Sequence, residues 1–153
     1  GEGEAEIPRM VELSRELPVE VRFIELMPIG ECAHWPEGRF IPNTRVLEVV
    51  PELEPCGSSG VAWLYSLPNA KGRVGLISPL SSHFCPECNR IRITPDGRLK
   101  PCLHSAQEIE LRGLRGAELD AKLMEGICAK PMRHHLSAVS PSESLRGMSR
   151  IGG

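Results

Sequence analysis

The spacing of apolar residues predicts a helix followed by a strand at the start of the chain. Over residues 6–17, apolar side chains recur at helical spacing with charges between them, and Pro18 ends this pattern. Residues 19–28 then alternate apolar and charged side chains up to Met27 and Pro28, which predicts a strand. Helix, strand and glycine-containing loop in succession are typical of an α/β sheet or barrel. Ligand sites in such folds gather beyond the carboxyl ends of strands, so we expect a site near Met27.

The later patterns are more varied. In chain order they predict a loop over 30–42, a helix from Asn43 as N-cap to about Val50, a connector over 51–60, a hairpin over 61–80, a second hairpin over 89–103, helices over about 106–112 and 117–130, and an irregular tail from His134. One helix and one strand cannot bury their own apolar faces. We therefore expect the first segment to pair with a second copy, as a homodimer, or to be the back half of a larger protein.

Composition narrows the class of protein. The length of 153 residues corresponds to about one domain, and a hydrophobic fraction of 41% suffices for a buried core. A net charge of −2 argues against nucleic acid or an anionic membrane as partner. No apolar run approaches the roughly 20 residues of a membrane span, and no signal peptide opens the chain. A cytoplasmic location is expected, and a first residue Gly1 instead of Met indicates processing or a start partway through a gene.

Three of the six cysteines lie close together in the run HFCPECNRIRITPDGRLKPCL. The CxxC pair, Cys85 and Cys88, offers two metal ligands from one tight turn. Residues 95–97 (Pro-Asp-Gly) predict a hairpin turn that brings Cys102 back beside this pair. Spacing leaves three interpretations open: a zinc site completed by His83 or His104, three buried free thiols, or an iron–sulfur cluster that lacks a cysteine on one iron.

The other cysteines carry no such pattern. Cys32, Cys56 and Cys128 are expected to be small core or surface residues. A secreted disulfide scaffold is disfavoured, because such proteins are usually short and have little core. His134 and His135 follow a predicted helix end and are expected to be structural.

Two arginines directly follow the CxxC pair. Arg90 and Arg92 alternate, so both can project from one face of a strand. They are either a solvated strand face or an anion site, and guanidinium forks match phosphate geometry. Arg22 lies among apolar strand neighbours, where it is either an edge residue or a charge aimed into a site. The terminal Gly152-Gly153 is either a frayed end or a tail that threads a narrow site.

Several motifs together resemble one family. The segments VRFIELMPIG, GRVGLISPLSSHFCPECNRIRIT, DGRLKPCL and the terminal IGG are similar to the C-terminal half of the GTP 3′,8-cyclases, radical S-adenosylmethionine enzymes that begin molybdenum cofactor biosynthesis. The resemblance implies an α/β fold: the C-terminal part of an incomplete (β/α) barrel followed by a small α+β iron–sulfur cluster domain. On this basis residues 1–50 would be barrel elements, 51–133 the domain that binds the cluster and GTP, and 134–153 an irregular tail.

The resemblance also implies roles for individual residues. Cys85, Cys88 and Cys102 would hold a [4Fe–4S] cluster whose free iron binds the purine of GTP. Arg90, Ile91 and Arg92 would contact GTP, and Met27 would contact S-adenosylmethionine. Arg22, Gly152 and Gly153 would belong to the active site.

The implied reaction converts GTP to (8S)-3′,8-cyclo-7,8-dihydroguanosine 5′-triphosphate, which cyclic pyranopterin monophosphate synthase then consumes. A second [4Fe–4S] cluster, held by an N-terminal CxxxCxxC, would cleave S-adenosylmethionine. This motif is absent from the 153 residues, and the family's RPM near the end reads Arg146-Gly147-Met148 here. We therefore expect the substrate-binding half of a cyclase, inactive alone. The alternatives are a zinc-stabilised interaction module and the auxiliary-cluster domain of another radical S-adenosylmethionine enzyme.

Overall fold

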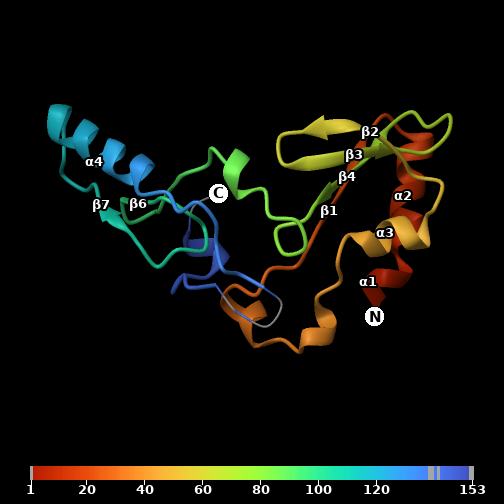
Figure 1. The fold of residues 1–153 in the computed structure, drawn as a ribbon, viewed down its shortest axis with the longest axis horizontal. Helices are drawn as coiled ribbons and strands as arrows, with labels where there is room; N and C mark the ends of the chain where they lie inside the picture. Colours follow the sequence, from red (N-terminus) through yellow and green to blue (C-terminus); the bar gives the residue numbers. More distant parts are fainter. Residues whose placement is uncertain (1, 138–139, 141, 152–153) are drawn as a thin grey trace. The chain divides into compact units, whose positions relative to one another are not determined.

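The computed structural model describes residues 2–137, 140 and 142–151 and has a mixed α/β fold, as the sequence predicts (Figure 1). The chain divides into two compact units. The first unit comprises Gly1–Leu26 and Pro36–Phe84, and the second comprises Met27–Trp35 and Cys85–Gly153. No helix of the described residues is long and apolar enough to cross a membrane.

The first unit is a four-stranded sheet with helices. Its elements are α1 (Glu2–Ala5), α2 (Ile7–Glu16), β1 (Glu20–Ile24), the 3₁₀ turn η2 (Glu37–Arg39), α3 (Thr44–Val49), β2 (Glu54–Ser59), β3 (Ala62–Ser66) and β4 (Arg73–Ile77). The strand order is β1-β4-β3-β2, which places β1 and β2 at the two edges. β1 runs parallel to β4, whereas β3 pairs antiparallel with both of its neighbours. The predicted first helix and first hairpin are confirmed. The predicted first strand is confirmed as β1, but it ends at Ile24 and not at Met27.

The core of the first unit forms between the inner faces of its helices and the sheet, mainly at β4. α2 buries Ile7, Val11 and Ser14 at helical spacing. β4 lies between two other strands, and its Val74 is 0% exposed. The remaining buried members of this cluster are Val46, Val50, Leu53, Leu67 and Leu76.

A glycine holds the end of α2 and the start of β1 against the start of β4. The Gly72 N–H donates to the Ser14 carbonyl at 2.7 Å, and the Arg73 N–H donates to the Val19 carbonyl at 2.9 Å. A Cβ atom at Gly72 would lie 2.6 Å from the Leu17 carbonyl oxygen and would also collide with the Val19 carbonyl oxygen. Only glycine permits so close an approach of two backbones.

The predicted connector over 51–60 is wrong, because residues 54–59 form β2. All six residues of β2 are exposed, so no apolar alternation marks the strand in the sequence. The strand forms through its pairing with β3, which includes a bulge between Pro55 and Gly57. A proline and a bulge are tolerated here because β2 is an edge strand.

The second unit is a three-stranded antiparallel sheet with one long helix. Its elements are η1 (Gly30–His34), η3 (Cys85–Glu87), β5 (Arg92–Ile93), β6 (Arg98–Lys100), β7 (Ile109–Glu110), α4 (Gly116–Cys128) and η4 (Met148–Arg150). The strand order is β5-β6-β7. α4 lies along β6 and β7 (Figure 1). Its Gly126 is buried, and a Cβ there would lie 2.9 Å from Cγ of Leu99, so helix and sheet pack without a gap.

The predicted helix over about 106–112 is wrong. Residues 109–110 form β7, whose Ile109 pairs opposite Leu99 and whose Glu110 pairs opposite Arg98. Seven residues are too few for periodicity to distinguish a short buried strand from a helical turn. The predicted second hairpin and the helix over 117–130 are confirmed as β5–β6 and α4.

Candidate metal centre and substrate site

The CxxC pair occupies a single turn. Cys85 begins the 3₁₀ turn η3, and the Cys88 N–H donates to the Cys85 carbonyl at 3.1 Å. Both cysteines are half-buried. The turn therefore offers two thiols from one short stretch of backbone, as the spacing predicts.

Cys102 follows the second strand of the β5–β6 hairpin. In this hairpin Arg92 pairs opposite Lys100. The turn is closed by the Gly97 N–H, which donates to the Thr94 carbonyl at 2.9 Å, and Gly97 has a φ of +80°. The hairpin thus returns the chain so that the segment of Cys102 lies beside the segment that leaves the CxxC turn, as the turn signal predicts.

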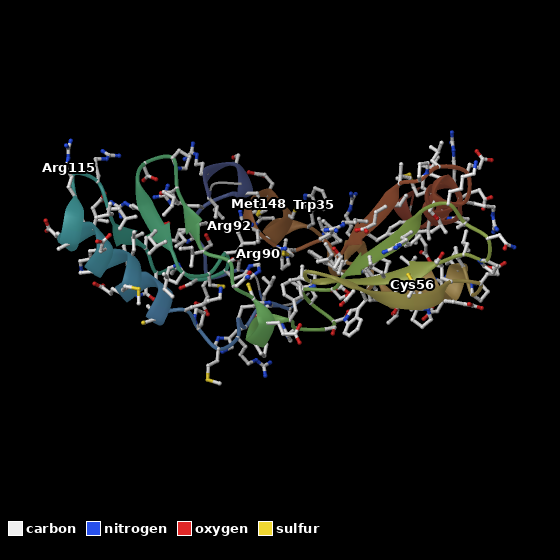
Figure 2. All side chains as sticks on the ribbon, turned by 90° about the horizontal axis from the view of Figure 1, so that it is seen from above. Trp35, Cys56, Arg90, Arg92, Arg115 and Met148 are labelled. Atoms are coloured by element: carbon white, nitrogen blue, oxygen red, sulfur yellow. The ribbon has the colours of Figure 1, made fainter. Side chains whose placement is uncertain are left out.

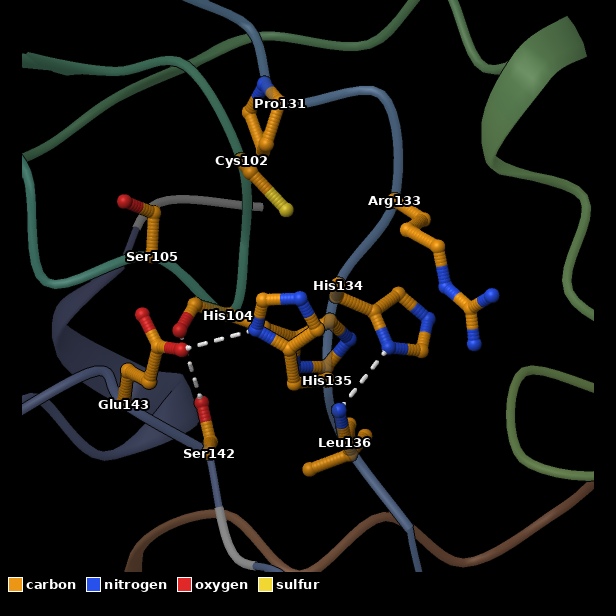
Figure 3. Close-up of a pocket in the computed structure, with 10 residues that line it drawn as sticks. All are labelled: Cys102, His104, Ser105, Pro131, Arg133, His134, His135, Leu136, Ser142 and Glu143. Carbon is orange, nitrogen blue, oxygen red and sulfur yellow. Dashed lines mark hydrogen bonds and ion pairs between the residues drawn. The ribbon is translucent and has the colours of Figure 1, made fainter.

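A small cavity of about 80 Å³ borders Cys102 (Figure 3). His104 and His134 also line it, and their rings meet edge to face with centroids 4.6 Å apart. The Leu136 N–H donates to Nδ1 of His134 at 3.2 Å. A ring nitrogen of His134 lies within 4.8 Å of the Cys85 Sγ atom. His134 therefore lies near the Cys85 thiol and lines the same cavity as Cys102 and His104.

Sequence reasoning missed this histidine pair. His134 was expected to be structural, and the 30 positions that separate it from His104 give no spacing signal. His104 was weighed only as a zinc ligand because it lies two residues after Cys102. The other zinc candidate, His83, belongs to the first unit.

All six cysteines are free thiols. Cys32 is half-buried in η1, and Cys128 at the end of α4 is exposed. Cys56 on β2 is also exposed (Figure 2). These three hold surface or partly buried positions, as expected. They also provide controls for the clustered cysteines.

The predicted GTP-contacting run leads into the hairpin. Arg90 is exposed, Ile91 is 36% exposed, and Arg92 opens β5 with a half-buried side chain (Figure 2). The run begins two residues after Cys88, so both arginines lie within four residues of this thiol in the sequence. Arg98 and Arg146 belong to the same unit, but both pair with carboxylates there.

The remaining predicted site residues are distributed over both units. Met27 is half-buried and begins the short segment of the second unit that contains η1. Arg22 lies on β1 in the first unit, where its guanidinium pairs with Glu20 at 2.6 Å. Gly152 and Gly153 lie outside the described residues. The structure leaves the predicted roles of these residues untested.

Glu25 is a buried carboxylate that sequence reasoning did not single out. Glu25 is 2% exposed, and its carboxylate accepts hydrogen bonds from the N–H groups of Leu80 (2.8 Å), Ser81 (3.0 Å) and Asn43 (3.1 Å) and from the Ser81 hydroxyl. Asn43 was predicted to cap α3, but its side chain makes no capping hydrogen bond. It donates instead to the Ile77 carbonyl at 2.8 Å. A glutamate on the apolar face of a strand is the signal that could have identified this site.

An ionic network anchors the tail within the second unit. Arg146 donates to both oxygens of Asp96 at 2.9 and 2.7 Å and to both oxygens of Glu108 at 2.6 and 2.8 Å. Glu108 also contacts Lys100 Nζ at 3.4 Å, and the Lys100 side chain is 0% exposed. Hydrogen bonds from Arg146 hold the pKa of Asp96 and the pKa of Glu108 below their ordinary values. Hydrogen bonds to Glu108 and Asp96 raise the pKa of Arg146.

This network predicts a loss of stability in acid. Carboxyls with a lowered folded-state pKa stabilise the fold above their unfolded-state pKa, near 3.8 for Asp96 and 4.5 for Glu108. That stabilisation disappears as the pH falls from these values through the folded-state pKa. We expect Arg146→Gln to destabilise the chain clearly at pH 7, with a difference from wild type that shrinks between about pH 4.5 and pH 2. Urea unfolding of both proteins across this range measures it, and a pH-independent difference would contradict it.

Comparisons with known proteins show the family of this chain. Residues 19–136 match the family described as Molybdenum Cofactor Synthesis C, and the chain belongs to that family. The match includes the CxxC turn, the β5–β6 hairpin and Cys102.

Individual relatives carry one name. The chain is 47% identical over 158 residues to the GTP 3′,8-cyclase of Alkaliphilus oremlandii (strain OhILAs) and 49% identical over 160 residues to that of Alkaliphilus metalliredigens (strain QYMF). It is 43% identical over 157 residues to the GTP 3′,8-cyclase of Clostridium acetobutylicum. Each match covers 100% of this chain and 49% of the relative. The chain therefore spans about half the length of the relatives it matches.

Proposed function

We propose that this chain is the substrate-binding half of a GTP 3′,8-cyclase that acts in molybdenum cofactor biosynthesis. The reaction is the conversion of GTP to (8S)-3′,8-cyclo-7,8-dihydroguanosine 5′-triphosphate by radical S-adenosylmethionine chemistry. The observation that supports the proposal is the β5–β6 hairpin, which pairs the strand that ends two residues before Cys102 with the strand that follows the CxxC turn, in a chain that matches GTP 3′,8-cyclases along its whole length.

The donor set suits a [4Fe–4S] cluster. Cys85, Cys88 and Cys102 are free and half-buried, so each thiol is accessible to iron. Three thiolates leave one iron without a protein sulfur. When bound, the cluster supplies a coordination position that a purine nitrogen or oxygen can occupy.

The protein's own contribution is charge and orientation. Arg90 and Arg92 would bind the triphosphate, because guanidinium forks pair with phosphate oxygens through two parallel hydrogen bonds. Ile91 lies between them and would contact the nucleoside. Held at base and triphosphate, the ribose is fixed so that C3′ and C8 can meet, which is catalysis by positioning. Met27, Arg22 and the terminal Gly152-Gly153 would complete the active site around S-adenosylmethionine and GTP.

The rest of the reaction needs parts outside these 153 residues. The CxxxCxxC that would hold the second cluster, the one that cleaves S-adenosylmethionine, is absent from this sequence. The chain by itself is therefore proposed to bind GTP without turnover. Cyclic pyranopterin monophosphate synthase would be the enzyme that consumes the product.

One observation favours a second candidate, a zinc-stabilised interaction module. His104 lines the cavity beside Cys102, and a ring nitrogen of His134 lies within 4.8 Å of the Cys85 Sγ atom. Mixed cysteine and histidine ligands are typical of structural zinc. The metal content of the protein separates the two candidates.

The proposal is tested by anaerobic reconstitution with iron and sulfide. We expect about four iron per chain in wild type and a loss of iron in Cys85→Ala, Cys88→Ala and Cys102→Ala. Cys56→Ala, an exposed cysteine on β2, is the matched control and should load iron normally. A wild-type chain that takes up no iron, or that retains one zinc instead, would overturn the cyclase assignment.

GTP binding to the reconstituted chain tests the arginines. Each of Arg90→Ala and Arg92→Ala should weaken GTP binding by roughly 10- to 100-fold, since a hydrogen bond between charged partners contributes about 1.5–3 kcal/mol. Arg115→Ala, at the start of α4, is the control. Unchanged GTP affinity in both variants would favour the auxiliary-cluster domain of a different radical S-adenosylmethionine enzyme. Isothermal titration calorimetry measures the dissociation constants.

A further inference from the structure

A lysine just beyond the carboxyl end of α4 contacts both segments that carry the clustered cysteines. Lys130 Nζ donates to the Arg90 carbonyl at 2.7 Å and to the Pro101 carbonyl at 3.2 Å. Arg90 lies two residues after Cys88, and Pro101 immediately precedes Cys102. One ammonium group therefore joins the backbone that leaves the CxxC turn to the backbone that enters the third cysteine.

The place of Lys130 is fixed by the packing of α4. Gly126 lies so close to Leu99 of β6 that any larger side chain there would move the helix away from the sheet. The Ala129 N–H still donates to the Glu125 carbonyl at 2.9 Å, so helical hydrogen bonding continues to the residue before Lys130. A cation at this point also meets the negative end of the helix dipole. The helix thus fixes the position of the Lys130 ammonium group relative to the hairpin.

The β-sheet pairing does not by itself set the separation of the two segments. β5 and β6 pair only over Arg92 to Ile93 and Leu99 to Lys100. Between Cys88 and β5, and between β6 and Cys102, no ladder hydrogen bond ties the strands together in the described chain. The two bonds from Lys130 bridge this part, at Arg90 on one side and Pro101 on the other.

We propose that Lys130 is a positioning residue for the metal centre: it sets the spacing between the CxxC turn and Cys102 and fixes the backbone of Arg90. The inference rests on the proposed function, because a metal held by all three thiols is what makes this spacing matter. Groups that orient metal ligands without touching the metal typically change its affinity by 10- to 100-fold when they are removed.

The experiment compares Lys130→Met with Lys122→Met. Both lysines belong to the same part of the chain, but Lys122 forms only an exposed pair with Glu125. In the iron-free chain, hydrogen exchange of the amides in 89–92 and 100–103 should become about tenfold faster in Lys130→Met alone. In the reconstituted chain, iron loss to a chelator should become 10- to 100-fold faster in Lys130→Met and stay unchanged in Lys122→Met. Lys130→Arg keeps N–H donors and should restore most of the retention.

The outcomes are distinguishable. Faster exchange and faster iron loss at an unchanged melting temperature, with rescue by arginine, would support the role. Iron loss equal to wild type in Lys130→Met would overturn it while leaving the proposed function intact. A wild-type chain that loads no iron would overturn both. If Lys130→Met fails to fold, Lys130→Arg and Lys130→Gln are measured in its place. A loss of iron retention in both variants, at the melting temperature of wild type, would refute a role of the donated hydrogen bonds.

Discussion

Replacing Glu25 with glutamine is expected to destabilise the first unit by about 2 kcal/mol. Replacing it with alanine is expected to cost about 3 kcal/mol, so the glutamine variant loses more than half as much stability as the alanine variant. The reason is that the carboxylate accepts hydrogen bonds from three backbone N–H groups and one hydroxyl. Glutamine replaces one accepting oxygen with an NH₂ group that faces N–H groups. Alanine leaves all of these donors without their acceptor in a site where the side chain is 2% exposed.

Urea unfolding of the two variants measures this difference. Glu48→Gln is the matched control, since Glu48 is 58% exposed and pairs with Arg45 at the surface of α3. Its effect should stay within about 0.5 kcal/mol. A glutamine variant as stable as wild type would show that the carboxylate is dispensable at this position. In the glutamine variant, amide exchange should also accelerate at Leu80 and Ser81, at the beginning of the stretch that leads to Cys85.

Replacing Gly72 with alanine is expected to destabilise the first unit by about 3 kcal/mol. The added methyl group would collide with the carbonyl oxygens of Val19 and Leu17 and lie 2.8 Å from the Val19 nitrogen. These are backbone atoms, so no rotamer change can relieve the overlap. The chain would have to separate β4 from the turn before β1, and the bond from the Gly72 N–H to the Ser14 carbonyl would weaken.

Gly38→Ala provides the comparison for this substitution. A methyl group at Gly38 would meet no atom within 4 Å, and the residue does not adopt a left-handed conformation. Thermal unfolding of both variants should therefore show a large drop in melting temperature for Gly72→Ala and almost none for Gly38→Ala. Equal melting temperatures would mean that the turn before β1 gives way easily.

The elements that the sequence predicts well are those whose side chains are sorted by burial. α2 and the β3–β4 hairpin place apolar residues at regular spacing because one face of each packs on a core. β2 was missed because no side chain of it is buried, and β7 because two residues carry no period. Both exist only through hydrogen bonds to a neighbouring strand, which a single sequence segment does not record.

One part of the candidate site could likewise be predicted from the sequence, and another part could not. Local turn chemistry predicts the β5–β6 hairpin, which is confirmed, whereas the joint binding of a metal by Cys102 and the CxxC pair stays a prediction. The bonds of Lys130 to the Arg90 and Pro101 carbonyls join residues 40 and 29 positions apart. Arg146 contacts carboxylates 38 and 50 positions away. Separations of this kind depend on how helix and tail fold back, so spacing rules could not find them. Ligand roles remain predictions that metal analysis decides.

The position of β1 at the rim of its sheet has a consequence for handling the protein. Within the described chain, β1 offers its peptide groups to β4 along one side only, and Ile24 on this strand is 57% exposed. A strand rim of this kind can adhere to the rim of another molecule. The protein is therefore expected to self-associate at high concentration. A further strand that paired parallel to β1 along this rim would suppress the self-association.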